Sequence, residues 1–315
     1  MTRVAGVDCG TNSIRLLVAD LDPAAGTLTD VDRRMEIVRL GQGVDRTGRF
    51  SPDALERTFA ACRRYADVMR DAGVERLRFV ATSASRDVAN RGDFVAGVVD
   101  ALGVDPEVVS GDEEAALSFA GATRELAGCD EPFLVVDIGG GSTEFVLGTS
   151  GGGPNAGLSV DIGCVRMTER HLHSDPPTED EVAQARADID GVLDTVAGAV
   201  PLGDARTLVG LAGTVTTVAA MALDLPAYIA ERIHHSRIPA AEVRDVTGRL
   251  LAMTHDQRAA LPFMHPGRVD VIGAGAMVLS AILDRVPVDA VLVSEHDILD
   301  GIAWSLVQGA TAADR

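Results

Sequence analysis

The sequence predicts an α/β protein built from two similar domains that face each other across a cleft. The main observation is that one short pattern, D-x-G-x-x-S, occurs twice, at Asp8–Ser13 and at Asp137–Ser142. Each copy follows a strand-like apolar run and leads into another, so both copies are expected at hairpin tips. The copies lie 137 − 8 = 129 residues apart, and a similar order of strands follows each of them.

The first domain is expected to open with a meander of three strands, at about 3–8, 13–20 and 27–40. Ser51 and Pro52 then predict the start of a helix, because Ser caps helix N-termini and Pro is favoured at the first helical position. The remaining elements are expected to be a strand at 76–82, helical segments within 86–102, a short strand at 107–109, and a helix from about Asp112 to Ala127.

The second domain is expected to repeat the meander and then to become largely helical. Its expected strands are 132–137, 142–149, 156–162, 206–211 and 289–293, and its expected helices are 164–173, 179–198, 214–222, 240–252 and 268–285. The predicted domains are 1–128 and 129–295. A last helix at about 297–308, within a C-terminal segment of about 296–315, is expected to pack back onto the first domain.

Composition limits where the protein is expected to work. At 315 residues and 46% hydrophobic, the chain is long enough for two domains with cores of their own. It has no apolar run of about 20 residues that would span a membrane, and its N-terminus enters a strand at once. A cytoplasmic protein is therefore expected. Its four cysteines are scattered, which favours reduced thiols over disulfides or a zinc site.

The charged residues exclude several classes of enzyme. All 28 basic residues are Arg, so the Lys of a Walker A loop, of a protein kinase or of a Schiff base is missing. The net charge of −19 argues against general binding to nucleic acid, which usually requires a basic face. A phosphorylated substrate would therefore be held by Arg, by backbone amides and by a metal ion.

Seven segments, taken together, resemble one known family. They are DCGTNSIRLL at 8–17, ATSASRDVAN at 81–90, SGDEEA at 110–115, VVDIGGGSTEFVLG at 135–148, DIGCVRMTE at 161–169, GLAGTVTT at 210–217 and HPGRVDVIGAGA at 265–276. In this order they resemble the exopolyphosphatase and guanosine pentaphosphate phosphohydrolase (Ppx/GppA) family, in its short actinobacterial form. The resemblance implies two ribonuclease H-like domains of the actin, Hsp70 and sugar-kinase superfamily.

The resemblance also implies an activity and a general base. The expected reaction is hydrolysis of a terminal phosphoanhydride bond, in inorganic polyphosphate or in guanosine pentaphosphate, a nucleotide of the stringent response. Short chains are expected to be favoured, because the acidic surface and the absence of Lys provide no track for a long polyanion. In the family pattern, Glu114 of SGDEEA is the base that deprotonates water, and Glu113 is its neighbour.

The same pattern assigns the remaining site residues. Asp137 and Glu144 flank the second glycine loop and are expected to bind Mg²⁺, with Asp8 opposite them. Arg86 is the expected cationic clamp on phosphate, and Arg15 and Arg166 are weaker candidates. The expected phosphate-binding backbone comprises Gly10, Thr11, Asn12, Ser13, Gly139, Gly140, Gly141, Ser142 and Thr143.

Several interpretations stay open. The turn at Gly210–Thr217 fits either a nucleotide's base or ribose or a packing turn between strand and helix. The histidines lack metal-ligand spacing, and Cys9 is read as a small filler. Ser294–Gly301 lacks the Arg of the family's S-x-x-G-L-R-E-G segment. The rival functions are an ATP-dependent small-molecule kinase and a nucleotide or phosphate sensor, and a homodimer is expected.

Overall fold

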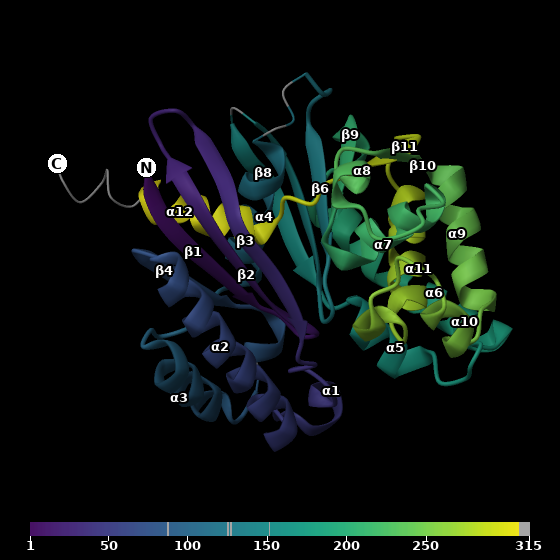
Figure 1. Ribbon diagram of the computed structural model, residues 1–315. Coiled ribbons are helices and arrows are strands. Elements are labelled where there is room, and N and C mark those ends of the chain that lie inside the picture. The colour runs from purple at the N-terminus through teal and green to yellow at the C-terminus, as the bar shows by residue number, and fades with distance from the viewer. Residues whose placement is uncertain (87, 125, 127, 151, 309–315) are drawn as a thin grey trace. The chain divides into compact units, whose positions relative to one another are not determined.

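The structure is a computed structural model that describes residues 1–86, 88–124, 126, 128–150 and 152–308 (Figure 1). Contacts between Cα positions divide the chain into two compact units. Unit 1 is Met1–Gly121 with Ile298–Arg315, and unit 2 is Ala122–Asp297. The finer boundaries that the sequence places at 128 and 295 stay a prediction. Within the described residues, no helix is long and apolar enough to cross a membrane.

Unit 1 is a mixed sheet with helices on both faces. Its elements are β1 (Thr2–Cys9), β2 (Ser13–Asp22), β3 (Thr27–Ile37), α1 (Val44–Thr47), α2 (Pro52–Ala72), β4 (Arg76–Ala81), the 3₁₀ turn η1 (Ser83–Ser85), α3 (Arg91–Leu102), β5 (Glu107–Val108), α4 (Gly111–Thr123) and α12 (Ile298–Gln308). The strand order is β3-β2-β1-β4-β5. β2 and β3 run antiparallel to their neighbours, whereas β4 and β5 continue the sheet in parallel with β1.

The period-two alternation of β1 and β2 builds two cores in unit 1. Val7 and Leu16 face the core that contains Tyr65 of α2 and Phe94 of α3. Leu17 belongs to a second core, which α12 completes with Leu299, Ala303 and Trp304. α12 lies against β1, and Gly6 leaves only enough room for the Ile302 side chain there. The alternation therefore places the two helical layers on opposite faces of one sheet.

Unit 2 repeats this topology. Its elements are β6 (Phe133–Ile138), β7 (Thr143–Thr149), β8 (Gly153–Val160), α5 (Cys164–His171), α6 (Glu179–Ala199), the 3₁₀ turn η2 (Leu202–Asp204), β9 (Thr207–Leu211), α7 (Ala212–Ala222), α8 (Ala230–Ile233), β10 (Arg237–Pro239), α9 (Ala240–Ala252), α10 (His255–Ala259), the 3₁₀ turn η3 (Pro266–Arg268), α11 (Ile272–Leu283) and β11 (Ala290–Val293). The strand order is β10-β11-β9-β6-β7-β8.

Five strands of unit 2 correspond one to one to the five strands of unit 1: β6, β7, β8, β9 and β11 match β1, β2, β3, β4 and β5. β6 pairs antiparallel with β7 and parallel with β9, as β1 does with β2 and β4. β11 then continues in parallel as β5 does, and β10 adds an antiparallel edge. The α/β class with two mixed sheets, predicted from the repeated pattern, is confirmed.

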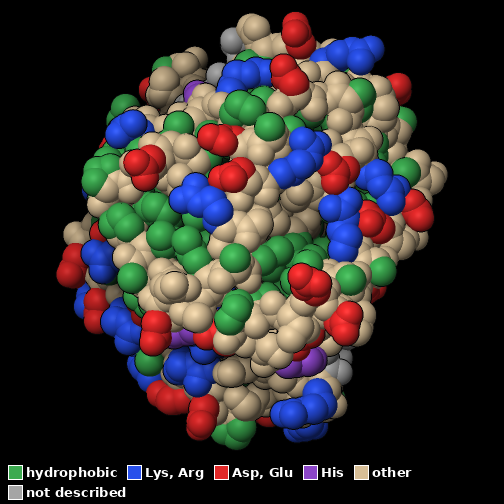
Figure 2. All heavy atoms as spheres, turned by 90° about the vertical axis from the view of Figure 1, so that its right-hand side faces the viewer, with side chains coloured by type: hydrophobic (Ala, Val, Ile, Leu, Met, Phe, Trp, Pro, Cys, Tyr) green, Lys and Arg blue, Asp and Glu red, His purple; other side chains and the backbone are tan. Residues whose placement is uncertain are grey.

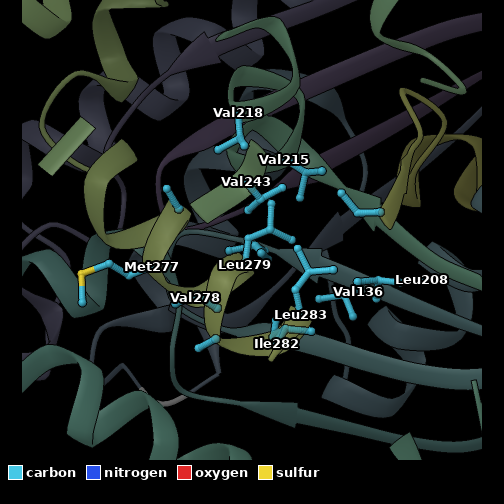
Figure 3. Packing of buried hydrophobic residues seen from close by; sticks show 14 of the residues in the cluster. Val136, Leu208, Val215, Val218, Val243, Met277, Val278, Leu279, Ile282 and Leu283 are labelled. Atoms are coloured by element: carbon cyan, nitrogen blue, oxygen red, sulfur yellow. The ribbon is translucent and has the colours of Figure 1, made fainter. Parts of the chain in front are cut away.

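The core of unit 2 surrounds α11. Every residue of this helix is buried, so it is apolar on all sides rather than amphipathic. Figure 3 shows Met277, Val278 and Leu279 of α11 among side chains from the neighbouring strands and helices, including Val136 and Val243. This packing fixes α5, α7 and α9 against the sheet and hence fixes the loops at the ends of the strands.

Most predicted elements are present, with shifts at their ends. Ser51 caps α2, accepting from the Ala54 amide at 3.2 Å, as the sequence predicts. The helix expected over 268–285 is shorter, because η3 and a break near Asp270 precede α11. The helix expected to end at Ala127 ends at Thr123, and Ala127 itself lies outside the described residues. The one-turn helices and β10 were not predicted.

The surface of unit 2 mixes both signs of charge. On the face in Figure 2, acidic and basic side chains lie interspersed. Ion pairs join side chains of both signs in unit 2: Arg186 of α6 and Arg244 of α9 both contact Asp284, at 2.9 and 2.8 Å. Both arginines therefore form ion pairs with a carboxylate of the same chain.

Candidate active site

Each D-x-G-x-x-S segment forms a tight turn between two antiparallel strands. In the first glycine turn (Gly10–Ser13), the Gly10 amide donates to the Ser13 carbonyl at 3.0 Å. In the second glycine turn (Gly139–Ser142), the Gly139 amide donates to the Ser142 carbonyl at 3.1 Å. The amides of Gly10 and Gly139 therefore close the turns and are not the amides that a phosphate would meet.

The carbonyls of the first glycine turn are satisfied from the segment after β3. Asn12 accepts from the amides of Val38 and Arg39, at 3.1 and 2.9 Å, and Thr11 accepts from the Gly41 amide at 2.9 Å. A Cβ on Gly41 would lie 2.3 Å from the Thr11 methyl group, so only glycine allows this approach.

The second glycine turn is held in the same way by the start of α5. Gly141 accepts from the Gly163 amide at 3.2 Å, and Gly140 accepts from the amides of Val165 and Arg166 at 2.9 and 3.1 Å. A Cβ on Gly163 would lie 2.3 Å from the Gly140 carbonyl. The segment 161–169 was matched to the family without a structural role. Its role here is to bind the carbonyl side of this turn.

With the carbonyls occupied, the amides remain for an anion. Among the residues that the structure describes, the N–H groups of Gly140, Gly141 and Ser142 have no acceptor, and neither does that of Thr11. Successive N–H groups of this kind form nests that bind phosphate oxygens. Thr143 differs, since its buried hydroxyl donates to the Ile162 carbonyl at 3.0 Å. Any contact of Thr143 with phosphate would come from its backbone.

The acidic residues of the second glycine turn form a cross-strand pair. Asp137 on β6 lies directly opposite Glu144 on β7, so both side chains project from the same face of the sheet. Asp137 is 6% exposed and Glu144 1% exposed. Ser159 on β8 donates its hydroxyl to Glu144 Oε1 at 2.7 Å. Two carboxylates held this close in a buried place repel each other unless a cation lies nearby.

The equivalent pair in unit 1 has opposite charges. Asp8 on β1 lies opposite Arg15 on β2, in the register that Asp137 and Glu144 occupy in unit 2. The Arg15 guanidinium contacts Asp8 Oδ2 through Nε at 3.0 Å and through Nη2 at 2.6 Å. The side chains of Arg15 and Asp8 are 17% and 6% exposed. Asp8 therefore has a built-in counter-ion.

The donor set of unit 2 suits Mg²⁺, which is often bound by one or two carboxylates and otherwise by water and substrate phosphates. Asp137 and Glu144 supply the two hard oxygen donors. Within the described part of the chain, no group of three His, Cys, Asp or Glu side chains is placed to hold a metal. The Asp8 carboxylate is paired with Arg15 within unit 1, and its role as a metal ligand stays a prediction.

Glu114 and Glu113 lie in the first turn of α4 but in different surroundings. Glu114 is buried, and its carboxylate accepts from Nη2 of Arg86. Arg86 also donates from Nε to the Val109 carbonyl at 3.0 Å. The Glu113 side chain is 48% exposed and pairs with Arg78 at 2.7 Å. The structure therefore joins two predicted site residues, Arg86 and Glu114, and separates Glu113 from them.

Two further residues have defined partners. Arg166 donates from Nε to the Gly141 carbonyl at 2.8 Å, so it supports the second glycine turn from its carbonyl side. Cys9 is fully buried at the end of β1. Burial raises the pKa of its thiol well above the usual value, which keeps it protonated and unreactive. These contacts fit a supporting role for Arg166 and the reading of Cys9 as a filler.

The turn at Gly210–Thr217 is packed against an arginine. A Cβ on Gly213 would lie 2.2 Å from the Arg268 guanidinium, which donates to the Thr217 hydroxyl at 3.2 Å. Ala212 takes a positive φ of 65°, which is uncommon for a residue with a side chain. In the segment Ser294–Gly301, which lacks the Arg of the family pattern, Asp300 accepts from Arg33 at 2.8 Å. This ion pair helps to hold α12 in unit 1.

Comparison with known proteins gives consistent matches over almost the whole chain. The model of the Ppx/GppA phosphatase family matches residues 17–309. Exopolyphosphatase 2 of Mycobacterium tuberculosis is 54% identical over 317 residues, which cover 97% of this chain and 99% of that protein. The crystal structure of an exopolyphosphatase-like protein aligns with a TM-score of 0.94 and 42% identity, covering 98% of this chain and 99% of the other. The Ppx/GppA family member of Aquifex aeolicus aligns with a TM-score of 0.81 and 29% identity, covering 100% of this chain and 99% of the other.

Proposed function

Because this chain belongs to the Ppx/GppA phosphatase family, we propose that it hydrolyses terminal phosphoanhydride bonds of inorganic polyphosphate, guanosine pentaphosphate or both. The observation that carries the proposal is the buried Asp137–Glu144 pair beside the N–H groups of the second glycine turn. An anion-binding turn next to two buried carboxylates on paired positions is what a phosphate–Mg²⁺ complex requires.

Each group has one task in the proposed reaction. The N–H groups of Gly140, Gly141 and Ser142 bind oxygens of the terminal phosphates and orient them. Asp137 and Glu144 would hold Mg²⁺, which when bound neutralises charge on the phosphate oxygens. Glu114 accepts a proton from a water molecule while the water oxygen bonds to the terminal phosphorus. The bridging P–O bond breaks, and the shortened chain leaves as an anion with inorganic phosphate as the other product.

Arg86 is best supported as a residue that positions Glu114. One side of its guanidinium binds the Val109 carbonyl, and the other binds the Glu114 carboxylate. A carboxylate fixed in this way is already oriented toward the water, so no side-chain conformational entropy is lost in each turnover. A direct contact of Arg86 with phosphate, as the sequence predicts, remains part of the proposal.

The activity is tested by measuring phosphate release from tripolyphosphate, long-chain polyphosphate and guanosine pentaphosphate, with and without Mg²⁺. We expect Mg²⁺-dependent release, faster from tripolyphosphate than from the long polymer, and a rise in polymer hydrolysis when salt screens the acidic surface over about 8–10 Å. Release from none of the three substrates would overturn the proposal. Processive degradation of the long polymer at low salt would overturn the short-chain preference alone.

Three broader expectations stay predictions. A cytoplasmic location is expected from the composition of the sequence, and a homodimeric state and a part in the stringent response accompany the family resemblance. The expectation that nucleic acid is not a partner rests on the net charge of −19. Gel filtration with light scattering measures the oligomeric state directly.

A further inference from the structure

Three of the seven histidines come together in unit 2, beside the end of β11. The rings of His234 and His235 are stacked, with centroids 3.7 Å apart and planes inclined by 27°. The His296 ring lies 4.6 Å from the His234 ring, inclined by 43°. This arrangement is not predictable from local sequence patterns, because His296 is 62 positions after His234.

Hydrogen bonds fix the stack and extend it to a tyrosine. The Glu295 amide donates to Nδ1 of His234 at 3.1 Å, which holds the His234 ring in place. Tyr228 donates its hydroxyl to Glu295 Oε1 at 2.6 Å. We call these five residues, Tyr228, His234, His235, Glu295 and His296, the stacking cluster.

Part of the stacking cluster is exposed. His235 is an exposed residue, and Tyr228 is 39% exposed in a chain with only 3% Phe, Trp and Tyr. His235 also has a positive φ of 58°, held by a hydrogen bond of 2.7 Å from its amide to the Val293 carbonyl. This backbone conformation is uncommon in a residue with a side chain, and it holds the exposed His235 ring against the His234 ring.

The stacking cluster lies at the same end of the sheet as the second glycine turn, where the parallel strands β11, β9 and β6 finish. In the parallel ladders, Val293 of β11 is paired with Gly210 of β9, and the next residue of β9, Leu211, is paired with Asp137 of β6. β11 is thus two strands away from β6, which places it about 10 Å from Asp137. A nucleotide with its terminal phosphate at the turn spans a distance of this order to its base.

We propose that the stacking cluster binds the base of a purine nucleotide whose phosphates extend toward the second glycine turn. The inference rests on the proposed function, because the turn is taken as the phosphate end of the site. Imidazole rings stack on heteroaromatic bases, and the Glu295 carboxylate accepts hydrogen bonds from a ring N–H or an amino group. Inorganic polyphosphate lacks a base and makes none of these contacts. The cluster therefore separates the two substrate classes.

The test replaces the His235 ring while keeping its backbone conformation. His235→Asn removes the ring, and Asn tolerates a positive φ. His235→Phe restores a ring that can stack. His173→Ala is the matched control, a histidine of unit 2 outside the cluster. The dissociation constants of GDP, ADP and tripolyphosphate are measured by titration calorimetry for each variant.

We expect His235→Asn to weaken GDP or ADP binding by about tenfold or more, the loss expected for one stacked base. The loss for tripolyphosphate should be at least fivefold smaller. His235→Phe should restore nucleotide binding, and His173→Ala should change neither constant. Equal losses for nucleotide and tripolyphosphate in His235→Asn, or no loss for nucleotide, would overturn the inference.

The outcomes also separate this inference from the proposed function. If the wild-type chain hydrolyses tripolyphosphate but binds neither GDP nor ADP, the stacking cluster is not a base site and the proposed function stands. If it hydrolyses neither tripolyphosphate nor guanosine pentaphosphate, the proposed function fails. Nucleotide binding that depends on a ring at position 235 would then still support the base site.

Discussion

The two glycine turns have the same backbone and opposite charge patterns. Both close through a Gly amide and a Ser carbonyl, and both have their remaining carbonyls bound by a later segment of the same unit. At the paired positions beside the turns, however, unit 1 has Asp8 with Arg15, whereas unit 2 has Asp137 with Glu144. The carboxylate beside the first turn is paired with an arginine, whereas the carboxylate beside the second turn is paired across the strands with another carboxylate.

The third strand of each meander continues this difference. Ser159 on β8 lies opposite Glu144 and donates to it, while Met35 on β3 lies opposite Arg15. A hydroxyl that orients a carboxylate is useful where a metal must be held, because ligands need fixed orientations. The comparison teaches that two turns of the same geometry can have different cross-strand neighbours. We propose that these neighbours decide which turn holds a metal ion.

The largest expected effect concerns Glu114, the proposed general base. We expect Glu114→Gln to fold normally and to reduce turnover by about 10²–10⁴-fold, because it removes the proton acceptor. Glu113→Gln is the matched control, with a small effect, since Glu113 is half exposed and paired with Arg78. Turnover of tripolyphosphate under saturating Mg²⁺ measures both variants. Equal losses would show that the base is assigned to the wrong residue.

The second prediction sets the carboxylates of the two turns against each other. We expect Asp137→Asn and Glu144→Gln each to weaken Mn²⁺ binding by roughly a hundredfold, because each removes a charged oxygen ligand. Asp8→Asn should change this affinity by less than about threefold, since Arg15 already neutralises Asp8. Calorimetry with Mn²⁺ as a substitute for Mg²⁺ measures the affinity without relying on turnover. A loss in Asp8→Asn as large as in the other two would make Asp8 the third ligand, as the sequence predicts.

The third prediction breaks the ion pair of unit 1. Arg15→Gln leaves the Asp8 carboxylate buried beside a neutral side chain, so we expect unfolding to become easier by about 1–3 kcal/mol. Combining it with Asp8→Asn should recover part of this loss, because the uncompensated charge is gone. Urea denaturation of the four chains in the cycle gives the coupling. Strictly additive losses would mean that the pair contributes nothing to stability.

Much of this comparison is already present in the sequence. When DCGTNSIR is aligned with DIGGGSTE, Arg15 takes the position of Glu144. The strand-like runs around both segments predict the hairpins. The first residues of α2 and α6 are also predictable, because Ser51 and Thr178 are N-capping residues. The pattern of a turn and its flanks is local, so the sequence carries it.

The rest depends on contacts between distant residues. Arg86 pairs with Glu114, which is 28 positions away in the sequence. Because a guanidinium binds carboxylate and phosphate equally well, the residue type alone does not predict this partner. The stacking cluster joins residues around 234 to residues around 296 through pairing of β10 with β11, and β10 is only three residues long. Helices as short as α8 and α10 have too few residues for a periodic apolar pattern. For such features the tertiary structure decides.

The smallest expected effect tests whether Ser159 supports the metal site proposed for unit 2. Ser159→Ala removes the donor to Glu144 Oε1 and leaves that carboxylate less well oriented. We expect Mn²⁺ affinity to fall by about tenfold, the lower end of the effect of second-layer partners on metal sites. Ser150→Ala is the matched control, because Ser150 also donates to a glutamate, Glu131, at 2.5 Å, but at the far end of β7 from the turn. If both variants bind Mn²⁺ like the wild-type chain, the Ser159 hydrogen bond serves the packing of β8 alone. The asymmetry between the two turns then reduces to the single exchange of Arg15 for Glu144.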